Sequence, residues 1–161
     1  MAQAQFVKPP KQLVDKTGKG IPGAGAKALK KAEEAAKKHT ARVDYKAIAQ
    51  ESLDQINSSL KQLLDDPASR EAEKRIYELA HNLKGEGASF GYPAVSRVAD
   101  LLCRVTEKPG QKSPRRLKVI RVQIDSLKAM VRENVKGSPQ GIALEVIQAL
   151  GTLVEKYLGN A

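Results

Sequence analysis

Prolines and glycines divide this chain into helical segments. Four prolines lie where a helix could begin, and proline is tolerated in a first helical turn because its missing N–H would be unpaired there. We therefore expect helices to begin at Asp66-Pro67, Tyr92-Pro93, Ser113-Pro114 and Ser138-Pro139. Asp66, Ser113 and Ser138 are also good N-cap residues. Four glycines are expected to end helices: Gly91, Gly110, Gly137 and Gly159.

Apolar residues between these breaks recur with a period near 3.6, and no segment alternates as a strand would. The rows expected to face a core are Ile48, Ser52, Ile56, Leu60 and Leu63; Ile76, Ala80 and Leu83; Val95, Val98, Leu102 and Val105; Ile120, Ile124, Leu127, Val131 and Val135; and Ala143, Val146, Ile147, Leu150 and Val154. Short connections favour antiparallel neighbours. The sequence thus predicts an all-α, antiparallel up-and-down bundle over residues 41–161.

The first 40 residues differ in character from the rest. Residues 1–23 combine prolines, glycines and lysines without periodicity, which predicts a disordered basic leader. Residues 24–40 are rich in alanine and lysine, with Leu29 as their one large apolar residue, so we expect a helix that is weakly docked or free. A chain of 161 residues accommodates one domain with such an appendage, and no second catalytic domain.

The net charge of +10 is concentrated toward the N-terminus, because residues 1–40 contain nine lysines and three acids and so carry +6 of it. The one cysteine, Cys103, excludes an intramolecular disulfide, and we interpret it as a small buried residue of the third helix of the bundle. The sequence has neither a signal-peptide core nor a run of 18 apolar residues. These features predict a cytoplasmic protein without a membrane span or metal site.

His81 is the strongest candidate for chemistry. Lys84 and Gly85 follow it at three and four residues, so the three positions share one face of a helix. A neutral imidazole can attack a phosphoryl group, an ammonium can offset the charge of its oxygens, and a glycine leaves room for a partner. His81 falls on a row with Tyr77 and Ala88, away from the apolar rows, and should face solvent. From spacing alone, an ordinary surface histidine is an equal alternative.

The run from Ala80 to Gly91, AHNLKGEGASFG, resembles the phosphorylation segment of histidine phosphotransfer (HPt) domains. It is also similar to the phosphoacceptor domain of chemotaxis histidine kinases, especially in its Phe90-Gly91 ending. The resemblance implies a four-helix bundle with a histidine exposed midway along one helix, here from Pro67 to about Phe90. The helix from Pro93 to about Glu107 would be its hairpin partner.

This resemblance also implies roles for the residues around the histidine. His81 would be the phosphorylated nucleophile and carrier, Lys84 would stabilise charge, and Gly85 would give access. Tyr77 and Ala88 could contribute to a docking patch, whereas Phe90 fits better as a core residue at the hairpin. Cys103 is a departure, since it lies 22 positions after His81, where the chemotaxis-kinase domains carry a glutamate that hydrogen-bonds their histidine.

The sequence contains no phosphate-binding loop and no carboxylate cluster suited to Mg²⁺. We therefore expect a phosphocarrier, not a kinase. It would accept a phosphoryl group from a phospho-aspartate receiver domain or a sensor histidine kinase of a bacterial two-component system and pass it to a response-regulator aspartate. The partner receiver would supply Mg²⁺. The charged outer faces favour a monomer.

Two other functions stay open. The pI of 9.7 and the lysine-rich leader are compatible with a basic helical nucleic-acid-binding protein, although most of the net charge lies within residues 1–40 and arginine clusters are scarce. The chain could also bind receivers without ever being phosphorylated on His81.

Overall fold

The computed structural model describes residues 24–42, 44–107 and 113–159, and the residues within these ranges form six helices and no strand. The predicted all-α fold is therefore confirmed. The chain divides into two units, Met1–Val43 and Asp44–Ala161. The leader predicted over residues 1–23 and the helix end predicted at Gly110 lie outside the described residues.

The first unit contains helix α2, Ala24–Arg42. Residues 25–38 are all exposed, including Leu29, whose side chain is the one large apolar group of this stretch. The composition explains the helix, because alanine and lysine are both good helix formers.

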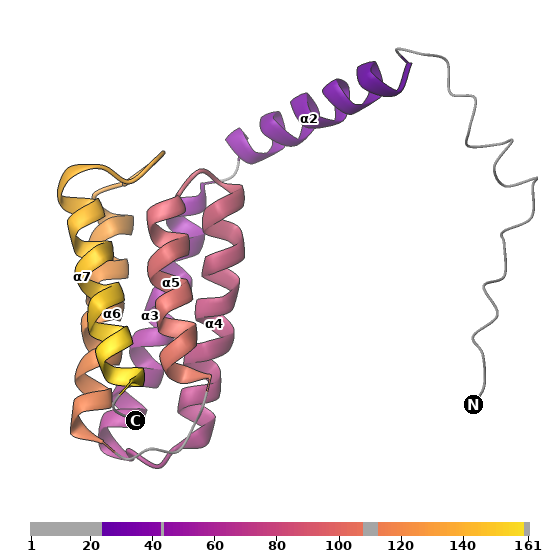
Figure 1. The fold of residues 1–161 in the computed structure, drawn as a ribbon. Helices are drawn as coiled ribbons and strands as arrows, with labels where there is room; N and C mark the ends of the chain where they lie inside the picture. The colour runs from indigo at the N-terminus through magenta and orange to yellow at the C-terminus, as the bar shows by residue number, and fades with distance from the viewer. Residues whose placement is uncertain (1–23, 43, 108–112, 160–161) are drawn as a thin grey trace, which may run out of the picture. The chain divides into compact units, whose positions relative to one another are not determined.

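The second unit is a helical bundle of α3 (Tyr45–Asp65), α4 (Arg70–Ser89), α5 (Pro93–Thr106), α6 (Pro114–Arg132) and α7 (Gly141–Leu158). The first four close a ring, since α3 packs on α4, α4 on α5, α5 on α6 and α6 on α3. Helix α7 lies outside this ring against α5 and α6 (Figure 1). The contact between α4 and α5 is the most extensive of the bundle.

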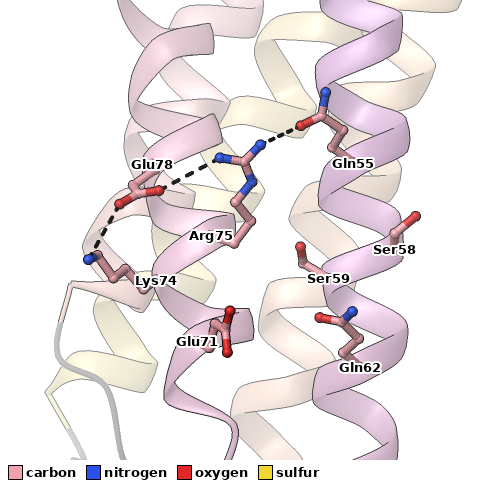
Figure 2. A pocket seen from close by; sticks show the side chains of 8 residues that line it. All are labelled: Gln55, Ser58, Ser59, Gln62, Glu71, Lys74, Arg75 and Glu78. Carbon is pink, nitrogen blue, oxygen red and sulfur yellow. Dashed lines mark hydrogen bonds and ion pairs between the residues drawn. The ribbon is translucent and has the colours of Figure 1, made fainter.

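The outer seam between α3 and α4 is polar. Arg75 of α4 donates a hydrogen bond to Gln55 Oε1 of α3 at 2.7 Å. Glu78 lies 3.8 Å from Lys74 Nζ and 3.9 Å from Arg75 Nη1 (Figure 2). A shallow pocket follows this seam. The pocket is lined by two basic side chains, Lys74 and Arg75, and by two acidic ones, Glu71 and Glu78, so its formal charges cancel.

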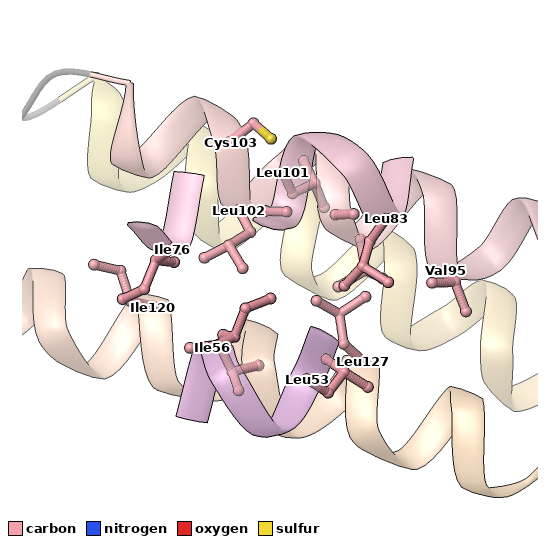
Figure 3. Packing of buried hydrophobic residues seen from close by; sticks show 14 of the residues in the cluster. Leu53, Ile56, Ile76, Leu83, Val95, Leu101, Leu102, Cys103, Ile120 and Leu127 are labelled. Carbon is pink, nitrogen blue, oxygen red and sulfur yellow. The ribbon is translucent and has the colours of Figure 1, made fainter. Parts of the chain in front are cut away.

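The core is built from aliphatic side chains of all four ring helices, and Figure 3 shows those of α3, α4, α5 and α6 converging. The rows predicted for α4 and α5 are buried throughout. The row predicted for α3 was wrong in its first turns: Ile48 is 38% exposed, whereas Tyr45, Ala49 and Leu53 are buried. The buried stripe begins one position off the expected row because an aromatic and a small residue face the core there.

Two predicted helix starts were also wrong. Helix α4 begins at Arg70, not Pro67, because Asp66 Oδ1 accepts from Ala68 N and closes a turn, and Ser69 then acts as N-cap by accepting from Ala72 N. Helix α7 begins at Gly141 after Gln140 and not at Pro139. The starts at Pro93 and Pro114 are confirmed.

The hairpin between α4 and α5 is closed by aromatic rings. Phe90 stacks on Tyr45 with ring centroids 5.2 Å apart, and Tyr92 lies 4.6 Å from Tyr45. Phe90 is therefore a core-packing residue, as expected. Gly91 has φ +81°, a conformation that glycine adopts at little cost, and its carbonyl accepts from Gly137 N at 2.9 Å. This hydrogen bond joins the hairpin to the connection between α6 and α7.

Candidate functional site

His81 lies in the middle of α4 with its side chain exposed. Its neighbours Ala80 and Leu83 are fully buried and fix the rotation of the helix, so His81 points away from the core. Tyr77 lies one turn earlier, with its ring centroid 6.1 Å from that of His81, and is half-buried against the core. The imidazole is thus carried on a rigid helix and open to a partner.

Lys84 lies one turn after His81 and forms an ion pair with Asp100 of α5. Lys84 Nζ is 2.6 Å from Asp100 Oδ1, with the two side chains 46% and 43% exposed. The hydrogen bond to Asp100 and the charge of that carboxylate raise the pKa of Lys84 above its ordinary value. Lys84 is therefore a protonated cation at neutral pH, and its position is defined by α5.

A row of α5 residues faces this part of α4. Ser96 Oγ donates to the backbone carbonyl of Lys84 at 2.7 Å, and Cys103 Sγ lies 4.0 Å from the backbone carbonyl of Tyr77. Together with Asp100, these residues follow a spacing of four and three, so they occupy one face of α5. Sequence reasoning missed Ser96 and Asp100, because their spacing from Cys103 places the three residues on one face of α5 but does not show that this face meets Lys84.

The glycines and alanine after His81 have different environments. A Cβ at Gly85 would meet nothing within 4 Å, so the bundle does not require a glycine there. A Cβ at Gly87 would lie 3.1 Å from Ser96 N and 3.2 Å from Tyr92 O, so this glycine permits the close approach of α4 and α5. Ala88 is exposed, two turns after His81. The face of α4 from Tyr77 to Ala88 is therefore open around the histidine.

Cys103 is buried, as expected, with 7% of its surface exposed. Burial raises the pKa of Cys103 to about 11, while the Lys84 ammonium opposes this rise. The thiol is neutral at physiological pH and cannot take the place of a carboxylate as an acceptor for an imidazole N–H. Asp100, the carboxylate on the same face of α5, pairs with Lys84.

Among the described residues, no group of three or more histidine, cysteine or acidic side chains is arranged to hold a metal ion. Within the same ranges, none of the helices has the length and apolar character needed to cross a bilayer. The polar seam of Figure 2 contains none of the expected site residues.

A model of the Hpt domain matches residues 41–133, which is more than half of the chain. The chain belongs to the Hpt domain family. The match covers helices α3 to α6, the closed ring, and includes His81 and the facing row of α5. Comparisons with curated proteins and with solved structures gave no match.

Membership of this family gives the chain its general function. Hpt domains are histidine phosphotransfer modules of phosphorelays, in which they interact with receiver domains and kinases. They are phosphocarriers that lack a kinase or ATP-binding domain of their own. Helix α7 lies beyond the matched residues and extends the ring of this Hpt domain on the side of α5 and α6.

Proposed function

We propose that this Hpt domain protein carries a phosphoryl group on His81, accepting it from the phospho-aspartate of a receiver domain or from a kinase and passing it to a response-regulator aspartate. The observation that carries the proposal is the exposure of His81 in the middle of α4, between Tyr77 and the Lys84 cation, within the matched domain. The free thiol of Cys103 fits a reducing cytoplasm.

The chemistry requires little of the chain itself. The unprotonated nitrogen of His81 attacks phosphorus, the bond from phosphorus to the aspartyl oxygen breaks, and the carboxylate leaves with the electron pair. The imidazolium ring then loses its remaining proton to solvent. Lys84 offsets charge on the phosphoryl oxygens, and the open space at Gly85 admits the receiver surface. We expect the receiver to bring the Mg²⁺ for this step.

Transfer from a phosphorylated receiver tests the proposal. A panel of receivers is phosphorylated with labelled acetyl phosphate and Mg²⁺, freed of excess donor, and mixed with the full chain. We expect label on the wild type that is lost in acid and stable in base. His81→Gln should carry no label, while its circular dichroism stays helical because the side chain is exposed.

His39→Gln is the matched control, because the chain has two histidines and His39 lies outside the matched domain. It should be labelled like the wild type. Label that persists in His81→Gln, or a wild type that binds phosphorylated receivers without accepting label, would refute the assignment. The second result would identify a binding module without phosphotransfer.

A further inference from the structure

Helix α5 contacts both the backbone and the side chain of Lys84. Ser96 Oγ donates to its backbone carbonyl at 2.7 Å, and Asp100 Oδ1 accepts from its ammonium at 2.6 Å. Serine and aspartate are four residues apart and therefore neighbours on one face of α5. The cation nearest His81 along α4 is thus already partnered before any phosphoryl group arrives.

We propose that Asp100 is a positioning residue that limits how strongly Lys84 holds a phosphoryl group on His81, so that the group is retained less and passed on more readily. This inference rests on the function proposed above and concerns the control of the same site. Neither the motif around His81 nor the match to the Hpt domain assigns a role to Asp100.

Asp100 and the phosphoryl group compete for a single cation. A phosphoryl group adds a charge of about −1.5 to −2 near pH 7 and three strong acceptor oxygens. Lys84 lies three residues from His81 on the same helix, within reach of those oxygens, but the Asp100 carboxylate offsets its charge. Any contact that Lys84 makes with the phosphoryl group is therefore made against the attraction of Asp100.

The exposure of the Lys84 and Asp100 side chains determines how strongly Asp100 competes with the phosphoryl group. Both side chains are nearly half exposed, so water and salt screen the pair and the competition is moderate. Asp100→Asn removes the charge but keeps the shape. We expect it to raise the equilibrium ratio of phosphorylated chain to phosphorylated receiver by about two- to fivefold. The increase should shrink as the salt concentration rises.

The route through Lys84 is tested by a double-mutant cycle. Lys84→Gln should lower the same ratio, and adding Asp100→Asn to it should have no further effect, because no cation remains to be released. Asp100→Glu, which keeps the charge, should behave like the wild type. These readouts separate a charge effect from a loss of structure.

Glu155→Gln is the matched control for loosening of α5. Glu155 of α7 pairs with Arg104 of α5 at 2.7 Å, an exposed link between helices like that of Lys84 and Asp100 but outside the site. It should leave the ratio unchanged.

The proposal is overturned if Asp100→Asn leaves the ratio at the wild-type value, or if its effect persists in the Lys84→Gln background. A wild type that accepts no label from any receiver would instead refute the proposed function. The two failures are therefore distinguishable.

Discussion

Glu73 of α4 and Arg116 of α6 form an ion pair inside the bundle, with their side chains only 4% and 3% exposed. Arg116 Nη2 also donates to the backbone carbonyl of Val105, near the end of α5, at 3.1 Å. One arginine thereby links three helices. Since a buried charge is costly unless it is paired and hydrogen-bonded, each member of the pair depends on the other.

We expect Glu73→Gln to destabilise the protein by about 3 kcal/mol, because it leaves the buried Arg116 charge without its carboxylate. Urea denaturation followed by circular dichroism measures this loss. A change below about 1 kcal/mol would show that the carbonyl of Val105 and other neighbours suffice for the arginine.

Glu78→Gln is the control on the same helix. Glu78 also pairs with basic side chains, Lys74 and Arg75, but its side chain is 45% exposed. Exposed ion pairs contribute about 0–1 kcal/mol, so this variant should unfold close to the wild-type urea concentration.

The helices could be predicted from sequence because apolar periodicity and proline positions are local signals. Predictions from these local signals fail where two of the signals compete. At the start of α4, Asp66 is a good N-cap by type, yet its carboxylate closes the preceding turn and Ser69 caps the helix. At the start of α3, two rows one position apart both contain apolar residues, and the buried one contains Tyr45, Ala49 and Leu53 in place of Ile48 and Ser52.

The candidate site, too, could be predicted only in part from the sequence. The exposure of His81 and the positions of Lys84 and Gly85 follow from spacing along one helix. Asp100 could not be assigned to Lys84 in that way, because their pairing depends on how α5 is rotated against α4. The two helices approach closely at Gly87, where a Cβ would lie 3.1 Å from Ser96 N, and this packing between helices is not visible in the spacing along either helix.

Gln123 of α6 is fully buried, and neither its amide nitrogen nor its amide oxygen has a hydrogen-bond partner. Burying such a group without partners costs about 1–3 kcal/mol. Gln123→Met, of similar length, should therefore raise the free energy of unfolding by about 1–2 kcal/mol in urea titrations. Gln148→Met, at an exposed position of α7, should change it by less than about 0.5 kcal/mol. Destabilisation by Gln123→Met would indicate an internal water that satisfies the amide.

The thiol of Cys103 should be unreactive in the folded protein. Burial raises its pKa from 9.0 to about 11, so the reactive thiolate is about a hundredfold scarcer at pH 8 than in an ordinary cysteine. Iodoacetamide labelling at pH 8, followed by mass spectrometry, should be slow in buffer and fast in concentrated urea. Because the unfolded chain loses this proton at lower pH than the folded chain, stability should also fall as the pH rises above about 9. Equal labelling rates in both conditions would contradict the burial of Cys103.

Gly85 and Gly87 lie on the same helix and should respond oppositely to alanine. Gly85→Ala fills open space and should stabilise the bundle by about 0.5–1 kcal/mol, because alanine favours a helix more than glycine does. Gly87→Ala should destabilise it by about 1–3 kcal/mol, since its Cβ would press on backbone atoms of Ser96 and Tyr92 that cannot move without shifting α5. Thermal unfolding by circular dichroism separates the two.

A larger side chain at Gly85 should slow phosphoryl transfer even though it does not destabilise the bundle. If a receiver domain binds to the open face around His81, Gly85→Leu should slow the labelling of His81 at least tenfold. The free energy of unfolding of this variant should equal or exceed that of the wild type. The loss would lie in access, because nothing in the bundle lies within 4 Å of a Cβ at this position. Arg70→Leu, at the exposed start of α4, is the control for an added leucine and should be labelled at the wild-type rate. Unimpaired labelling of Gly85→Leu would mean that the receiver approaches His81 from another side.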